Sequence, residues 1–179
     1  METKTCTKCG IKKPLTEFGK NKHTKDSRTV WCLKCKRGYA KKRRLTPIGI
    51  YQAIKGQIKY TQAHAGERDY RGYIRPKRKN MTCTQLEFVE WYKSQPKKCA
   101  YCDIPDEYID KLNDTVMKRS KRLTIDCKDN DKGYDLDNLV LSCHRCNFMK
   151  SDILSYDAMR DVGQRHIKPI WEKILGFSL

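Results

Sequence analysis

Apolar residues follow a helical pattern in the first half of the chain. Between Ile48 and Tyr60, isoleucines occur at four-residue intervals, at positions 50, 54 and 58. This spacing places them on one face of a helix that follows Pro47. The preceding stretch, Lys36–Arg44, has good helical propensity and predicts a separate helix that ends before this proline.

A third helix is predicted to begin at Thr82 or Thr84. Thr84 and Glu87 have the three-residue spacing of a capping box, and the apolar residues from Leu86 to Tyr92 follow directly. Gln95 and the proline after it should end this helix. The tail, residues 154–175, carries an apolar stripe at helical spacing. There we expect Ser155 to act as a cap, a kink near Pro169, and packing on the core.

Between these helices the pattern changes to short apolar runs. Residues 123–126 (LTID) and 139–143 (LVLSC) predict two strands, and the turn-rich segment 130–137, with Gly133, predicts the loop between them. A helix is expected from Asn147 onward. The prediction is therefore a β-hairpin followed by a helix, with two helix residues facing the hairpin: Phe148 and Met149.

The compartment bears on how the cysteines are interpreted. The chain opens with polar and basic residues, and no run approaches the roughly 20 apolar residues of a membrane span. We therefore expect a cytoplasmic protein, encoded by a bacterium or a phage, whose thiols stay reduced. Cysteine pairs in that setting indicate metal ligands rather than disulfides.

The first cysteine set is Cys6-x-x-Cys9, 22 residues, and Cys32-x-x-Cys35. Two such knuckles match a four-cysteine zinc ribbon, because each presents two thiolates to a tetrahedral Zn²⁺. Four cysteines leave no open coordination position, so this zinc should be structural. A small core is expected between the knuckles, made of Phe18, Val30 and Trp31.

The second set is Cys99-x-x-Cys102 and Cys143-x-x-Cys146, separated by 40 residues. One metal would clamp the two ends of an inserted unit, which starts with a helix-rich segment at 103–122. This zinc is also expected to be structural, fixing the hairpin ends and the start of the helix. Cys83 and Cys127 have no C-x-x-C partner; Cys83 is expected to be an ordinary buried thiol.

Charge is distributed unevenly along the chain. The formal net charge is +18, and residues 1–80 contain 23 Lys and Arg against 5 Asp and Glu, whereas the remainder is neutral. A solvated basic face is the simplest interpretation, but the clustering favours a nucleic acid partner. Tyr70 and Tyr73 could stack on bases or sugars. The basic residues expected to bind phosphates are Lys41, Lys42, Arg43, Arg44, Arg71, Arg75, Lys77, Arg78 and Lys79.

Residues 82–155 resemble the HNH, or ββα-metal, endonuclease family. The resemblance is carried by the order of Asp126, a loop, Asn138, the 143–146 knuckle, Asn147 and Lys150. The ribbon is similar to those of some phage and mobile-element HNH proteins. The implied fold class is α+β: a zinc ribbon (1–40), a basic linker (41–81), and a zinc-stapled ββα-metal core embedded in helices (82–179).

The resemblance implies a role for each matching position. Asp126 becomes the first ligand of a catalytic divalent ion, Asn147 the ligand from the helix, and Asn138 the residue that orders the loop. Lys150, one turn after Asn147, could contact phosphate. The catalytic ion would be separate from the two structural zinc ions. It is expected to be Mg²⁺, with Mn²⁺ or Ni²⁺ as alternatives, because few protein ligands and several waters suit magnesium.

The position of the general base departs from the family pattern. Cys127 stands where the family has histidine. A cysteine with an ordinary pKa of ~8.5 carries a small thiolate fraction at neutral pH, which nearby lysines could increase. Asp129 is an equal candidate, ahead of Tyr134 and His144. A third alternative is a site that has no general base. Such a site would either act through metal-bound water alone or be inactive.

The function implied is a metal-dependent HNH endonuclease that hydrolyses phosphodiester bonds in DNA, most simply double-stranded DNA. A single ββα site cuts one strand, so duplex cleavage would need a homodimer or two binding events. The alternative is a non-cleaving, zinc-dependent nucleic-acid-binding protein in which Cys127 marks a lost base. A third interpretation is an RNA-binding or ribosome-associated zinc protein, indifferent to Asp126 and Asn147.

Overall fold

The computed structural model of the protein describes residues 2–68, 70, 72, 74, 80–113 and 122–176. The chain divides into two compact units, Met1–Ile54 and Lys55–Leu179. The three predicted domains, with boundaries after residues 40 and 81, stay a prediction. In the part of the chain that is described, every helix is too short or too polar to cross a bilayer.

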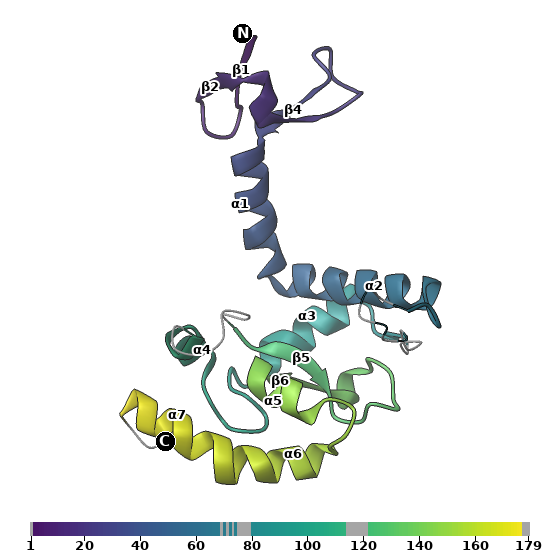
Figure 1. The fold of residues 1–179 in the computed structure, drawn as a ribbon, viewed down its shortest axis with the longest axis vertical. Coiled ribbons are helices and arrows are strands. Elements are labelled where there is room, and N and C mark those ends of the chain that lie inside the picture. The colour runs from purple at the N-terminus through teal and green to yellow at the C-terminus, as the bar shows by residue number, and fades with distance from the viewer. Residues whose placement is uncertain are drawn as a thin grey trace. The chain divides into compact units, whose positions relative to one another are not determined.

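The first unit begins with two small antiparallel hairpins (Figure 1). One pairs β1 (Thr3–Thr5) with β2 (Lys12–Pro14), and the other pairs β3 (Phe18–Lys20) with β4 (Arg28–Cys32). A 3-10 turn, Leu15–Glu17, joins the two hairpins. Strands this short are marginal on their own, so this unit needs a further constraint, and two of its cysteines, Cys6 and Cys32, lie in its small core.

The core of these hairpins is smaller than predicted. Cys6, Phe18 and Cys32 are buried together, and Trp31 packs against them. Val30 was wrongly placed in this core, because its side chain is 50% exposed. Three residues of β3, from 18 to 20, lie opposite five residues of β4, from 28 to 32, and the resulting irregularity breaks the inward and outward alternation.

Two helices follow, as predicted. α1 (Leu33–Arg44) begins three residues before the expected start, and α2 (Pro47–Ala63) has its proline at the first helical position, where no N–H is needed. Ile50 and Ile58 are buried, in agreement with the isoleucine spacing.

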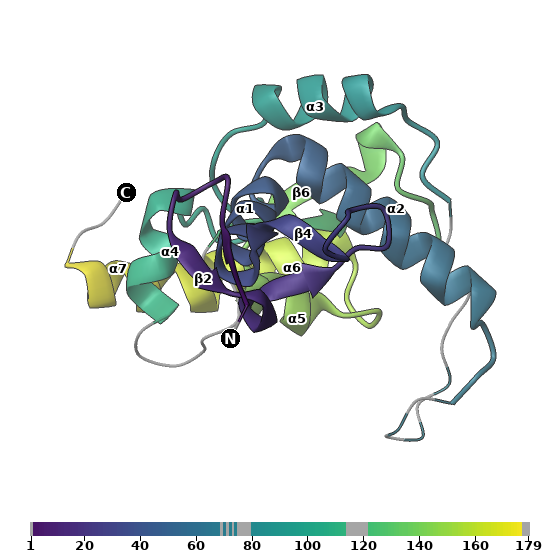
Figure 2. The ribbon, with the colours of Figure 1, turned by 90° about the horizontal axis from the view of Figure 1, so that it is seen from above.

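The next two helices lie in the second unit. α3 (Gln85–Ser94) begins after Thr84, whose side chain accepts a hydrogen bond from the Glu87 amide while Glu87 reaches back, so the predicted capping box is confirmed. α4 (Asp106–Asn113) forms the helix expected in the insertion. Both ribbon views place α4 at the same end of this unit as the last helix of the chain (Figures 1 and 2).

The predicted hairpin and helix are present. β5 (Thr124–Cys127) pairs antiparallel with β6 (Leu139–Ser142), and a 3-10 turn, Leu136–Asn138, leads into β6. α5 (His144–Lys150) begins three residues earlier than expected. The reason is local, because the Cys143 sulfur accepts a hydrogen bond from the Cys146 amide and caps the first turn.

The orientation of α5 differs from the prediction. Phe148 and Met149 do not face the hairpin, and the Phe148 side chain is 64% exposed. α5 instead buries Cys146 and Lys150, which lie four residues apart on one face. Phe148 lies on the opposite face, and the Met149 side chain is 49% exposed, so this prediction was wrong.

The tail is helical from Tyr156 to Leu175 but not uniform. α6 (Tyr156–Val162) is capped by Ser155, whose hydroxyl accepts from the Ala158 amide, as predicted. A π-helical segment, Gly163–Ile167, then leads into α7 (Lys168–Leu175). The irregularity lies just before Pro169, which cannot donate a backbone hydrogen bond to the preceding turn.

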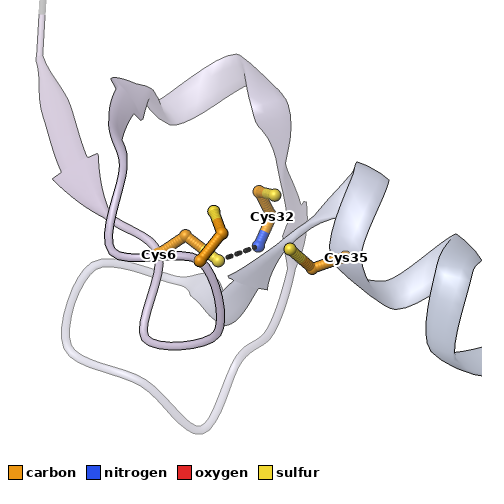
Figure 3. Close-up of side chains that lie close together, drawn as sticks. Cys6, Cys32 and Cys35 are labelled. Carbon is orange, nitrogen blue, oxygen red and sulfur yellow. Dashed lines mark hydrogen bonds between the residues drawn. The ribbon is translucent and has the colours of Figure 1, made fainter.

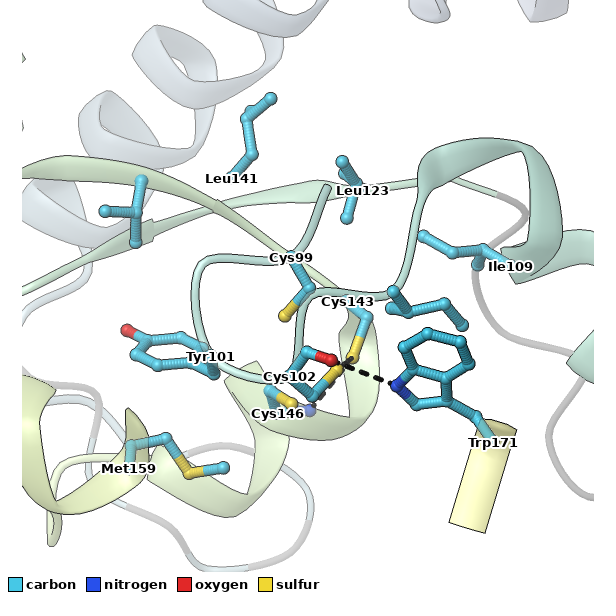
Figure 4. Close-up of a cluster of buried hydrophobic side chains, with 12 residues drawn as sticks. Cys99, Tyr101, Cys102, Ile109, Leu123, Leu141, Cys143, Cys146, Met159 and Trp171 are labelled. Carbon is cyan, nitrogen blue, oxygen red and sulfur yellow. Dashed lines mark hydrogen bonds between the residues drawn. The ribbon is translucent and has the colours of Figure 1, made fainter. Parts of the chain in front are cut away.

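The core of the second unit surrounds the second cysteine set (Figure 4). Residues from the hairpin, from α4 and from the tail bury their side chains around the four sulfurs. Packing of the tail on this core is thus confirmed. Besides the cysteines, the buried members are Tyr101, Ile104, Ile109, Leu123, Val140, Leu141, Met159 and Trp171.

Candidate active site

The two predicted cysteine sets each come together in space. Within each set, the four sulfur atoms lie within 4.8 Å of one another. A tetrahedral zinc with Zn–S bonds of about 2.3 Å would separate its sulfurs by about 3.8 Å. The distance between the sulfurs of Cys102 and Cys143 is 3.9 Å, which fits this requirement. Both sets are therefore compatible with zinc.

The first cluster has one sulfur held by the backbone. The Cys32 amide donates to the sulfur of Cys6 at 3.2 Å (Figure 3). Cys6 and Cys32 are buried, whereas Cys9 is exposed. N–H donors aimed at sulfur favour the thiolate form, which is the form that binds metal.

The second cluster is completely enclosed, because all four of its cysteines are buried. The knuckle at Cys99 is joined to the hairpin, since the Ala100 amide donates to the Leu141 carbonyl at 2.8 Å. It is joined to the tail as well, because the Trp171 indole donates to the Cys102 carbonyl at 3.0 Å. Figure 4 shows the four cysteines close together, with the Trp171 indole beside them.

Asp126 lies on β5 opposite Val140 and is partly buried. One carboxylate oxygen accepts from the Tyr101 hydroxyl at 2.7 Å, and the other accepts from the Cys127 amide at 2.9 Å. Burial raises the pKa of this carboxyl group, while the Tyr101 hydroxyl and the positive charge of Lys150 act in the opposite direction. A carboxylate with one donor on each oxygen keeps further lone pairs for a cation.

Asn147 approaches β5 from α5. Its amide nitrogen donates to the Ile125 carbonyl at 3.3 Å and to the Thr124 hydroxyl at 3.4 Å. Ile125 immediately precedes Asp126 in the strand. Because the amide nitrogen is directed at the strand, the amide oxygen is the atom left to coordinate an ion.

Lys150 occupies a different place from the one expected. Its side chain is 0% exposed, and its ammonium donates to the Asn130 side chain at 2.9 Å. Asn130 in turn donates to the Ser151 carbonyl, which ties the hairpin loop to the end of α5. In this conformation the ammonium does not reach the surface, so contact with phosphate stays a prediction.

Asn138 is buried beneath the loop that joins β5 and β6. Its amide oxygen accepts from the Asp129 amide at 2.9 Å, and its nitrogen donates to the carbonyls of Asp129 and Gly133 at 3.0 and 2.9 Å. The side chain therefore ties together the two sides of the loop.

Replacing Asn138 with alanine should destabilise this loop. The change leaves one amide and two carbonyls without their partner, at a cost of about 1–3 kcal/mol in the free energy of unfolding. Urea titration followed by circular dichroism measures this. The matched control is Asp137→Ala, because Asp137 is exposed and adjacent. Equal unfolding free energies for the two variants would contradict the role of Asn138.

The candidates for a general base lie in different settings. Cys127 is partly buried beside Asp126, with its sulfur 4.0 Å from the Gly133 carbonyl. Asp129 accepts from the Asp131 amide at 2.9 Å and lies 3.9 Å from the Lys132 ammonium. The Tyr134 amide donates to the Asn80 carbonyl. His144 is at the start of α5, with its ring 6.3 Å from that of Phe148.

The basic residues expected to bind nucleic acid fall into two groups. Lys41, Lys42, Arg43 and Arg44 form the last turn of α1, and all four are exposed. The second group lies outside the described residues, as does Tyr73: Arg71, Arg75, Lys77, Arg78 and Lys79.

One residue in contact with Asp126 was missed from the sequence. Tyr101 lies inside the Cys99–Cys102 knuckle, where only the cysteines had been assigned a role. Its hydroxyl meets a carboxylate 25 residues away. A tyrosine enclosed between two buried cysteines needs a hydrogen-bond partner for its hydroxyl. This requirement is the feature of the sequence that could have indicated a contact with a polar residue.

The sequence matches no protein-family model and no curated protein. Among solved structures, the chain is similar to the rare-cutting HNH restriction endonuclease PacI, a protein that perturbs DNA. The similarity has a TM-score of 0.53 and 21% identity, and it covers 97% of this chain and 99% of that one. At this identity the likeness shows the fold. The chain has the HNH fold, and the resemblance found in its sequence is confirmed at that level.

Proposed function

We propose that this protein is a metal-dependent endonuclease that hydrolyses phosphodiester bonds in DNA. The observation that carries the proposal is the arrangement of β5 and α5. Asp126 lies on the strand, and the Asn147 amide bonds to the carbonyl of the residue just before it. The fold shared with a DNA-perturbing HNH endonuclease supports the same class of activity.

The two side chains offer oxygen atoms, which are the ligands that Mg²⁺ prefers. The reaction joins a water oxygen to phosphorus and breaks the bond to the 3′ oxygen, leaving a 3′-hydroxyl and a 5′-phosphate. A divalent ion held by Asp126 and Asn147 would supply positive charge that stabilises the phosphate and the leaving oxygen. The two cysteine clusters would bind zinc that serves only the fold.

The proton of the attacking water needs an acceptor. We place Cys127 first, because it follows the metal ligand Asp126 directly and is partly exposed. The contacts of Asp129 with Asp131 and Lys132 hold its carboxylate within the loop, which makes it the second candidate.

The exposed lysines and arginines of α1 would bind the DNA backbone. α1 contains no acidic residue, so no carboxylate of the same helix neutralises these cations. A row of cations on one helix suits phosphate contact without sequence readout. Cutting both strands of a duplex would require two such sites, most simply from two copies of the chain.

The test is nicking of supercoiled plasmid by zinc-loaded protein with and without added Mg²⁺, Mn²⁺ or Ni²⁺. Nicking should require the added ion, and Asp126→Ala should lower its rate by at least about 100-fold. Cys127→Ala should also slow nicking, whereas Cys127→His should keep or raise the rate, since imidazole is the better base near neutral pH.

The matched control is Asp131→Ala, which removes an exposed carboxylate of the same loop and should cut like the wild type. If Cys127→Ala cuts as well as the wild type, the thiol is not the base. If Asp126→Ala cuts equally well, the metal site is placed wrongly.

A second candidate function rests on Cys127 itself. Near neutral pH an unperturbed cysteine is mostly protonated and cannot accept a proton, whereas imidazole is mostly in its basic form, so the scaffold could bind DNA without cutting it. This candidate predicts retained DNA binding and no nicking with any of the three ions. It also predicts that Cys127→His restores nicking only if the rest of the site is intact.

A further inference from the structure

The carboxylate of Asp126 accepts a hydrogen bond from Tyr101, a residue to which the sequence assigned no role. The Tyr101 hydroxyl donates to one of its oxygens at 2.7 Å, and the Tyr101 side chain is 0% exposed. The other oxygen accepts from the Cys127 amide. One donor on each oxygen fixes the rotation of the carboxylate, and therefore the direction of its remaining lone pairs.

Tyr101 is itself tightly constrained. It lies between two buried ligands of the second cysteine cluster, Cys99 and Cys102. Its ring contacts that of Tyr156, with centroids 5.5 Å apart, and its carbonyl accepts from the Gln164 side chain at 2.7 Å.

The tail also approaches the Tyr101 backbone without a side chain between them. A Cβ atom added to Gly163 would lie 2.5 Å from the Tyr101 carbonyl oxygen, closer than any real contact. Only glycine permits this approach. The cysteine cluster and the tail therefore enclose Tyr101 from both sides.

We propose that Tyr101 is a positioning residue, which orients the Asp126 carboxylate for the divalent ion and so links the second cysteine cluster to the metal site. The proposal rests on the proposed function, because it assumes that Asp126 binds the ion. Hydrogen bonds to a ligating carboxylate tune metal affinity, and their loss typically weakens binding about 10- to 100-fold.

The alternative role for Tyr101 is purely structural. A buried hydroxyl needs a partner, and Asp126 would simply satisfy it. In that case loss of the hydroxyl would lower stability but leave the affinity for the divalent ion unchanged. Metal affinity, measured on protein that has kept its zinc, therefore separates the two roles.

The experiment is isothermal titration of zinc-loaded protein with Mn²⁺ in the absence of DNA. Tyr101→Phe should bind Mn²⁺ about 10- to 100-fold more weakly than the wild type while keeping its zinc. Nicking by this variant should recover as Mn²⁺ is raised. Tyr156→Phe is the matched control, since it removes a neighbouring hydroxyl and keeps the ring contact; it should bind Mn²⁺ normally.

The outcomes are distinguishable. Normal Mn²⁺ affinity in Tyr101→Phe, with binding lost in Asp126→Ala, overturns the role of Tyr101 alone. Equal Mn²⁺ binding by the wild type and Asp126→Ala overturns the metal site and this proposal with it.

If Tyr101→Phe loses its zinc, the test is made on the wild-type protein instead. The ring-carbon resonance beside the Tyr101 hydroxyl should then shift on Mg²⁺ titration, and an unmoved resonance overturns the proposal.

Discussion

Replacing Cys102 with serine should release the metal of the second cluster and unfold the second unit, Lys55–Leu179. The four sulfurs are buried at the centre of its core, and the loss of one thiolate leaves the metal with an incomplete set of ligands. Structural zinc sites contribute about 10–16 kcal/mol of apparent binding free energy, which matches or exceeds the whole stability of a typical domain. We expect the zinc content to fall from two equivalents to one, with loss of most of the helical signal in circular dichroism, because α1 belongs to the first unit.

Two cysteines of the same unit provide matched controls. Cys83→Ser and Cys127→Ser change thiols that belong to neither cluster. Both variants should keep two equivalents of zinc. A Cys102→Ser protein that keeps two equivalents and melts like the wild type would show that the cluster is not a metal site.

Replacing Trp171 with alanine should be the most damaging single change outside the cysteines. Its side chain is buried in the cluster core, and its indole donates to the carbonyl of Cys102. Loss of a buried tryptophan typically costs about 3–5 kcal/mol in the free energy of unfolding. Trp171→Phe keeps most of the volume but leaves that carbonyl without its donor, so it should cost about 1–3 kcal/mol.

The neighbouring residue supplies the comparison. Ile170 lies on the same helix but is 56% exposed, so Ile170→Ala should change the unfolding free energy by less than about 1 kcal/mol. Urea titrations of the three variants, with zinc in excess, give the three values. If Trp171→Ala is no more destabilising than Ile170→Ala, the tail does not stabilise the core.

The elements that the sequence predicted well are those set by local rules. Cysteine spacing identified both clusters, because two C-x-x-C turns bring four sulfurs together regardless of what lies between them. The Thr84 capping box is present at the start of α3, which is the second of the two starts that the sequence left open. The strands were found from short apolar runs, and the order of Asp126, Asn138 and Asn147 indicated the fold.

What the sequence did not reveal depends on which face of an element meets the core. Phe148 and Met149 are apolar, yet α5 buries Cys146 and Lys150 instead, because the cluster requires the cysteine to face inward. Lys150 follows one turn later and is buried with it. The contact between Tyr101 and Asp126 joins residues from two elements, and no local pattern encodes it.

The π-helical segment Gly163–Ile167 sets the direction of the last helix. Met159 and Trp171 are both buried in one core, although they lie twelve positions apart in the chain. At roughly 100° per residue, a uniform α-helix would turn these two side chains about 120° away from each other. One wide turn takes up a residue without advancing the rotation and brings them back into line. A chain shorter by one residue in this segment could reach the same alignment as an ordinary α-helix, so the wide turn is how the fold accommodates a single inserted residue.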